Sequence, residues 1–185
     1  MSFILRTIFW TNDFFHGSPI RKQYRDVKRI FENKDSRCND IKQKHLEDIL
    51  LHASTFSLFY KDKGINLDNY PVVNKMILTE NFDKVCIAGP IHIQRTSGST
   101  GTPFAVPQDT RKRNRRIAEL KYFGEIVGFN SHDKLIQLRI WTKMQNKSWW
   151  QSVKENIVPF DISNLSVERK KELCKLIIRE KAKCI

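Results

Sequence analysis

Hydrophobic residues recur at helical spacing through the first half of the chain. After Pro19, which suits the first position of a helix, they fall every three or four residues. These residues are Ile20, Tyr24, Val27 and Phe31. A second, broader apolar face predicts a helix that begins near Asn39 or Asp40 and ends at Gly64. That face comprises Leu46, Ile49, Leu50, Ala53, Phe56, Phe59 and Tyr60.

Residues 1–15 are apolar in patches, with polar residues between them. The segment is too short and too polar to span a bilayer. It also lacks the basic start, apolar middle and small-residue cleavage site of a signal peptide. We therefore expect a strand or helix that packs on the body of a cytoplasmic protein, and we expect no membrane partner.

The spacing changes in the second half, where short apolar runs predict strands. These runs lie at 91–93, 104–106, 135–140 and 157–160, and residues 183–185 resemble the start of another strand. Strands that alternate with helical patterns favour an α/β fold.

Three polar residues are expected to cap helices. Asn74 precedes a short apolar run, and Asp109 precedes a longer pattern whose apolar face is Ile117, Leu120, Phe123 and Val127. Ser166 begins a final helix, with Glu168 near its positive end. The apolar residues of this last helix are Leu173, Leu176, Ile177 and Ile178.

The length of 185 residues fits one domain. We expect a mainly helical region at 1–90, followed by an α/β region at 91–185 whose helices pack on an incomplete sheet. No polar tail follows the last helix, so the chain is expected to stop within a sheet. A closely packed C-terminal strand is the alternative.

The segment 96–103 carries the clearest chemistry. It holds five hydroxyl side chains and two glycines. Glycines let backbone N–H groups converge, and hydroxyls add donors around the same point, which together suit phosphate oxygens. A Walker-type loop would need a Lys and a helix after its second glycine, whereas an apolar strand pattern follows here. The sequence therefore predicts a strand–loop–strand phosphate clamp rather than a polar linker.

The net charge of +13 suits nucleic acid, a membrane surface or a nucleotide as partner, and does not choose among them. The basic run of residues 111–116 wraps around its predicted helix, so we expect a solvated surface, with nucleotide steering as the second reading. Trp141, Trp149 and Trp150 lie near Lys143 and Lys147 and could stack bases, but we expect them to serve packing.

The histidines and cysteines show neither catalytic nor metal-binding spacing. We expect core or surface histidines and reduced thiols. These residues are His16, His45, His52, His92, His132, Cys38, Cys86, Cys174 and Cys184.

Residues 96–103 resemble the phosphate-binding loop of the adenylate-forming superfamily, in which hydroxyl residues surround two glycines and a proline follows. Many members carry Lys after that proline. Phe104 stands there in this chain, which resembles the phenylacetate–CoA ligase/CapK branch. Weaker similarity to that branch covers essentially the whole chain. It is found at 17–20, 59–61, 70–75, 80–82 and 110–128.

The resemblance implies the N-terminal portion of an adenylate-forming domain. Such enzymes use ATP, usually with Mg²⁺, to convert a carboxylic acid into an acyl-adenylate, and a thiol, commonly coenzyme A, then displaces AMP. By this resemblance the ATP phosphates would be held by Thr96, Ser97, Gly98, Ser99, Thr100, Gly101 and Thr102. No catalytic residue or metal ligand is assigned.

The family's adenine, ribose and hinge motifs and its late catalytic Lys lie further downstream than this chain reaches. We therefore expect a fragment of a ligase that is inactive alone. A role in capsule or surface-polysaccharide biosynthesis would rest on the CapK likeness only. The alternative function is a small basic nucleic-acid-binding module, which we do not favour. A third reading is a fragment that complements a separately encoded C-terminal half.

Overall fold

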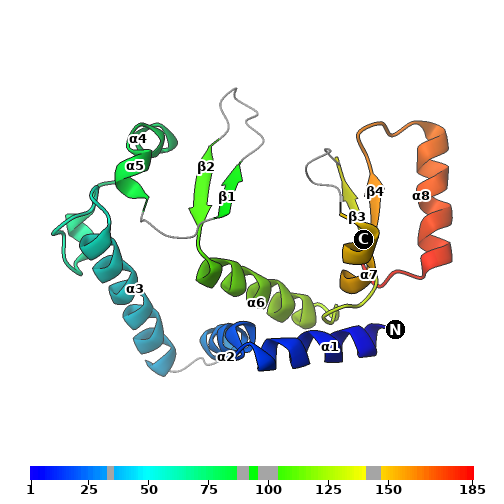
Figure 1. Cartoon of the computed structure of the whole chain (residues 1–185), viewed down its shortest axis with the longest axis horizontal. Helices are drawn as coiled ribbons and strands as arrows, with labels where there is room; N and C mark the ends of the chain where they lie inside the picture. The colour runs from blue at the N-terminus through cyan, green and yellow to red at the C-terminus, as the bar shows by residue number, and fades with distance from the viewer. Residues whose placement is uncertain (33–35, 87–91, 96–103, 141–146) are drawn as a thin grey trace. The chain divides into compact units, whose positions relative to one another are not determined.

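The computed structural model describes residues 1–32, 36–86, 92–95, 104–140 and 147–185 (Figure 1). The chain forms two compact units. One comprises Met1–Lys22 and Ala118–Ile185, and the other comprises Gln23–Ile117. The described residues are predominantly helical with small sheets, so the fold is mixed α and β. No helix in these ranges is long and apolar enough to cross a membrane.

Helix α2, Pro19–Glu32, begins at the proline that the sequence predicts for its first position. Its Val27 side chain is fully buried, as the helical spacing requires. Leu50 of the next helix, α3 (Ser36–Phe56), is buried too. Phe31, by contrast, is 55% exposed, so the predicted apolar face of α2 is only partly covered.

Helix α3 spans Ser36–Phe56, so both predicted ends are wrong. The apolar pattern continues to Tyr60, but the chain leaves the helix at Ser57. There the Ser57 hydroxyl and the Phe59 N–H both donate to the Lys84 carbonyl, at 3.0 Å each. Gly64 adopts a positive φ of 70° in a later turn, where its N–H donates to the Ser54 hydroxyl.

Residues 57–86 form an irregular segment with three short helices. These are η1 (Leu67–Asn69), α4 (Lys75–Glu80) and α5 (Phe82–Val85). The Asn74 cap is confirmed, since its side chain accepts from the Ile77 N–H at 2.9 Å. The Tyr70 hydroxyl lies within hydrogen-bonding distance of the Leu50 and Gly64 carbonyls and ties this segment to α3.

The first fifteen residues form helix α1, Ser2–Phe15, which settles the choice between strand and helix. Its Asp13 is almost fully buried. The carboxylate accepts from the backbone N–H groups of Ile20 and Arg21, at 2.9 and 3.0 Å. These N–H groups belong to the first turn of α2 and lack helical partners, so Asp13 closes the corner between the two helices.

Strands β1 (His92–Arg95) and β2 (Ala105–Gln108) form an antiparallel pair, and α6 (Thr110–Ile126) follows. The predicted cap is confirmed, because the Asp109 side chain accepts a hydrogen bond from the Lys112 N–H. The predicted apolar face of α6 is wrong. Ala118 and Tyr122 are the buried residues, whereas Leu120 and Val127 are largely exposed.

The second sheet is parallel. Strand β3 (Leu135–Arg139) pairs with β4 (Ile157–Asp161), and α7 (Trp149–Glu155) connects them. Ile136 and Phe160 form its buried centre. This is a β–α–β unit, in which parallel strands require a crossover connection.

Helix α8, Val167–Glu180, follows β4 and is capped by Ser166 as predicted. The chain then returns to the sheet, where Cys184 forms a parallel bridge with Leu135. The Ile136 N–H donates to the Cys184 carbonyl at 3.0 Å. The expected strand start is therefore confirmed, and β3 lies between β4 and Cys184.

Candidate functional site

The predicted phosphate loop, Thr96–Pro103, lies outside the described residues, and the structure describes the strands on either side of it. Strands β1 and β2 lie side by side in Figure 1 and pair in register, with Gln94 opposite Val106 and Arg95 opposite Ala105. Because Arg95 directly precedes residues 96–103 and Ala105 follows them closely, the described residues that flank the segment are held at the spacing of one antiparallel pair.

This arrangement confirms the predicted strand on each side of the loop. It also separates the segment from a Walker-type loop, in which a helix starts at the phosphate-binding residues. Here β2 intervenes, and α6 begins only at Thr110.

Two glutamines and an arginine tie the strand pair to α6. The Gln108 amide donates to Gln94 Oε1 at 2.9 Å, and Arg116 Nη1 donates to the same oxygen at 3.2 Å. A glutamine oxygen has two lone pairs and can accept both bonds. The strand frame and the helix are thus connected through one side-chain atom.

The basic run at the start of α6 separates into two groups. Arg111, Lys112 and Arg113 are exposed, as expected of a solvated surface. Arg115 is half-buried and forms an ion pair with Asp26 of α2, whose other carboxylate oxygen lies 3.5 Å from His45 Nε2. The run therefore forms no single stripe, and Arg115 joins two helices.

A second polar cluster, which the sequence did not predict, lies around Ser131. Lys121 Nζ donates to Ser131 Oγ at 2.5 Å, and that hydroxyl lies 2.7 Å from His132 Nδ1. The Lys121 amine also stands 4.0 Å from the centre of the Phe9 ring. Ser131 is almost fully buried, so these bonds exchange little with water.

Burial changes both titratable groups of this cluster. It lowers the pKa of Lys121 to about 8. Burial, together with the positive charges of Lys121 and Arg6, lowers the pKa of His132 to about 4. At neutral pH the imidazole is therefore uncharged, so Nδ1 can accept a hydrogen bond from the Ser131 hydroxyl while Lys121 donates to the Ser131 oxygen. His132, expected to be an ordinary core or surface residue, completes this chain of hydrogen bonds.

The same cluster holds α1 in place. Arg6 Nε donates to the Ser131 carbonyl at 2.9 Å, and its Nη2 pairs with Asp133 at 3.0 Å. The Asn156 amide donates to the His132 carbonyl at 2.8 Å. Ser131 is too enclosed to meet a substrate, so the arrangement suits positioning of α1 rather than nucleophilic chemistry.

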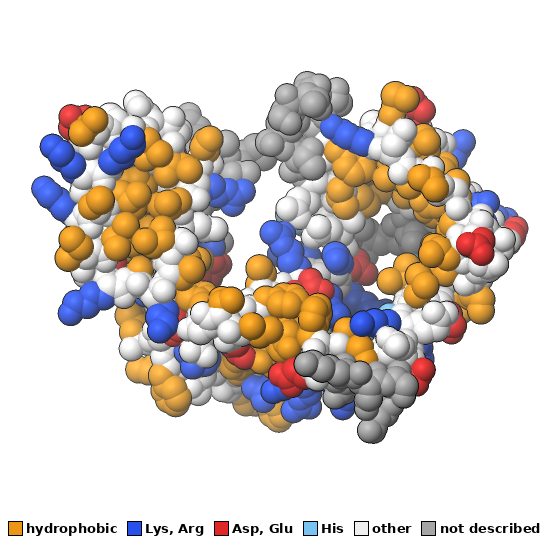
Figure 2. All heavy atoms as spheres, turned by 180° about the vertical axis from the view of Figure 1, so that it is seen from behind, with side chains coloured by type: hydrophobic (Ala, Val, Ile, Leu, Met, Phe, Trp, Pro, Cys, Tyr) orange, Lys and Arg blue, Asp and Glu red, His pale blue; other side chains and the backbone are white. Residues whose placement is uncertain are grey.

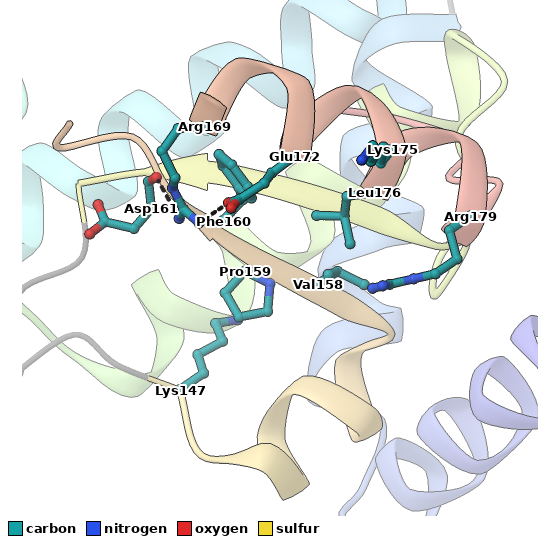
Figure 3. Close-up of a pocket in the computed structure, with 10 residues that line it drawn as sticks. All are labelled: Lys147, Val158, Pro159, Phe160, Asp161, Arg169, Glu172, Lys175, Leu176 and Arg179. Carbon is teal, nitrogen blue, oxygen red and sulfur yellow. Dashed lines mark hydrogen bonds and ion pairs between the residues drawn. The ribbon is translucent and has the colours of Figure 1, made fainter. Parts of the chain in front are cut away.

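A groove of about 770 Å³ runs between β4 and α8 (Figure 3). Its lining includes four cations and two carboxylates, most of them on α8. These are Lys147, Arg169, Lys175, Arg179, Asp161 and Glu172. Arg169 pairs with Glu172 and stacks 4.4 Å from the Phe160 ring centre. The balance of charge is positive, but Lys147 and Arg179 are also paired with carboxylates, those of Glu155 and Glu180.

The structure also describes two of the tryptophans and all four cysteines that the sequence analysis considered. Trp149 and Trp150 start α7 and are 66% and 74% exposed, so they do not form core packing as expected. Trp141 and Lys143 lie outside the described residues. The four cysteines are free thiols, and no three His, Cys, Asp or Glu side chains in the described ranges come together for a metal ion.

Comparison with protein-family models, with curated proteins and with solved structures gives no match to this chain. The likeness to adenylate-forming ligases therefore depends on the residues themselves.

Proposed function

We propose that residues 96–103 bind the β- and γ-phosphates of ATP, and that the chain is the phosphate-binding part of an adenylate-forming ligase of the phenylacetate–CoA ligase/CapK kind. One observation carries the proposal. The hydroxyl- and glycine-rich segment joins two paired antiparallel strands, with Arg95 opposite Ala105 at its ends. A loop fixed at both ends can hold its N–H groups toward one anion.

The chemistry of the loop is electrostatic. When a carboxylate attacks the α-phosphorus of ATP, negative charge accumulates on the departing pyrophosphate, and N–H and hydroxyl donors stabilise it. The carboxylate is already ionised at pH 7 and needs no general base. Exposed Arg111, Lys112 and Arg113 on the first turn of α6 add positive charge that attracts the nucleotide.

The other ligands of the reaction are not assigned to residues of this chain. Mg²⁺ would act as the counter-ion of the phosphates, and no described cluster of carboxylates, histidines and cysteines fits it. Coenzyme A and the carboxylic acid would meet parts of the enzyme that correspond to downstream motifs. We therefore propose phosphate binding for this chain and the complete ligation for the whole enzyme.

The test is ATP and pyrophosphate binding by equilibrium dialysis, comparing the natural chain with the double variant Ser99→Ala, Thr100→Ala. We expect at least a tenfold loss of affinity for both ligands. Thr55→Ala, which removes an exposed hydroxyl of α3, is the matched control and should bind as the natural chain does. Unchanged binding by the double variant would refute the assignment of the loop.

The second candidate is nucleic-acid binding. It is favoured by exposed Trp149 and Trp150, whose ring centres lie 4.5 Å apart. It predicts binding to single-stranded DNA that weakens steeply with salt and is lost in Trp149→Ala, Trp150→Ala. If the tryptophan variant bound DNA as tightly as the natural chain, this candidate would fail.

A further inference from the structure

One face of α1 is apolar, uncharged and turned away from its unit. Its five large residues are between 55% and 78% exposed, and two threonines complete the face. They recur three, four or seven positions apart, which places them on one side of a helix. These residues, called the α1 face below, are Phe3, Ile4, Thr7, Ile8, Thr11, Phe14 and Phe15.

The opposite side of α1 fixes this orientation. Arg6 binds the Ser131 carbonyl and Asp133, and Lys121 stands over the Phe9 ring. Asp13 is buried at the corner with α2. Because these contacts occupy the other side of the helix, the α1 face cannot turn inward without breaking them. Exposed apolar surface of this kind marks an interaction site in soluble proteins.

A shallow groove of about 420 Å³ lies along α1 and combines aromatic and cationic groups. Arg21 contributes a guanidinium group, which lies 5.0 Å from the Trp10 ring centre. Arg6 also lines the groove, but its guanidinium is paired with Asp133. The aromatic lining residues are Trp10, Phe14 and Phe15. Guanidinium groups bind phosphate oxygens, and aromatic rings suit the boundary between polar head groups and acyl chains. The groove thus matches a ligand with both an anionic and an apolar part.

We propose that the α1 face lies on the surface of a bilayer that contains anionic phospholipid. The helix would rest in the plane of the interface, with its phenylalanines among the acyl chains and Arg21 near the phosphates. The net charge of +13 attracts the chain to anionic lipid, and it opposes pairing of the same face with a second copy. Charge complementarity therefore favours the bilayer over self-association.

This mode of binding differs from membrane spanning. Helix α1 has 14 residues, too few to cross the hydrocarbon core, and a surface helix needs no such length. The sequence predicts no membrane partner because residues 1–15 cannot span. The exposure of the α1 face, which only the structure provides, leads to the surface mode. The inference is independent of the phosphate loop.

The test is co-sedimentation of the full chain with vesicles of phosphatidylcholine alone or of phosphatidylcholine with about one third phosphatidylglycerol. We expect binding to the anionic vesicles, at least tenfold weaker binding to the neutral ones, and loss of binding at high salt. The variant Phe14→Ser, Phe15→Ser should reduce binding to anionic vesicles at least tenfold.

The matched control is Val167→Ser, Ile178→Ser, which removes two exposed apolar residues of α8 and should bind as the natural chain does. Circular dichroism of each variant reports whether it is folded, and the salt dependence of the natural chain tests the proposal without any substitution. Absence of binding to anionic vesicles, equal binding to neutral ones, or unchanged binding of the phenylalanine variant would overturn the proposal. So would a dimer that the phenylalanine variant abolishes in the absence of vesicle binding.

Discussion

Lys121, Ser131 and His132 form a chain of hydrogen bonds beside the aromatic ring of Phe9. Burial of this chain changes the pKa values of its two titratable groups, Lys121 and His132. Burial favours the uncharged form of each, which lowers both pKa values. When the pKa of a group is lower in the folded chain, the unfolded chain binds more protons at any pH between the folded and the unfolded pKa. Each of the two groups, Lys121 and His132, therefore makes the free energy of unfolding rise with pH across its own range.

His132→Asn tests the lower range. The pKa of His132 is about 4 when folded and near 6.5 when unfolded, so the natural chain should lose stability as pH falls from 6.5 to 4. Because the ring is only partly buried, we expect a contribution of about 1–2 kcal/mol. Asn tolerates the positive φ of 63° at this position. Urea unfolding at both pH values should show a weaker pH dependence in the variant, and an identical dependence would contradict this account.

Lys121→Met tests the upper range. The pKa of Lys121 is about 8 when folded against an ordinary value of 10.5, so the natural chain should gain stability between pH 8 and 10. A gain of about 2 kcal/mol is expected, and the methionine variant should lack it. The free energy of unfolding, measured in urea at pH 7.5 and 10, gives the comparison. If both proteins gained stability equally, the lowered pKa would be wrong.

At the scale of the elements, short polar contacts decide where helices begin and end. Asn74, Asp109 and Ser166 each accept a backbone N–H within the first turn of a helix, and all three caps were predictable because the signal is local. The end of α3 was not predictable in this way. Its helical pattern continues past Phe56, and the hydrogen bonds of Ser57 and Phe59 with distant Lys84 override it.

Asp13→Ala tests the corner between α1 and α2. The substitution leaves two partly buried N–H groups, those of Ile20 and Arg21, without their acceptor. We expect a loss of about 2–3 kcal/mol in the free energy of unfolding. Asp40→Ala, at an exposed position of α3, is the matched control and should change stability by no more than about 0.5 kcal/mol. Equal effects of the two substitutions in urea unfolding would contradict the role of Asp13.

Helix α7 is a short element that the hydrophobic pattern of the sequence does not predict. It has only 7 residues, too few for an apolar pattern to establish helical spacing. Its signal is the capping box, in which Ser148 and Gln151 exchange side-chain and backbone hydrogen bonds. A serine followed three residues later by glutamine is readable in a sequence, so this helix could have been found. Ser148→Ala should lower stability by about 1 kcal/mol in the same urea assay. An unchanged midpoint would show that the cap contributes nothing.

For the whole molecule, the strand–loop–strand frame and the parallel β3–β4 pair follow from apolar runs that the sequence displays. The contacts between side chains at the candidate site cannot be predicted from the sequence in this way. The Lys121–Ser131–His132 chain and the Arg116–Gln94 bond join residues from different elements, and nothing in the spacing of these residues indicates that they meet. The outward direction of the α1 face is likewise a result of packing, because α1 is apolar on more than one side.

The chain alone should catalyse no ATP–pyrophosphate exchange. The proposed phosphate binding would position the leaving group, but the exchange also requires a bound carboxylate and groups that hold adenine and ribose, and no residue of this chain is assigned to these roles. Incubation of the pure protein with ATP, labelled pyrophosphate and a panel of carboxylic acids should yield no labelled ATP. Exchange above the level of a protein-free sample would contradict the expectation.

The most direct measurement for the central claim is a ¹H–¹⁵N correlation spectrum of the chain titrated with ATP, pyrophosphate and adenosine. Glycine amides are readily recognised, and the chain has only 7 glycines, two of them in the loop. We predict that ATP and pyrophosphate shift the amides of Gly98 and Gly101 and their neighbours, while adenosine leaves them unchanged. Shifts confined to other parts of the chain, or equal shifts with adenosine, would contradict phosphate binding by residues 96–103.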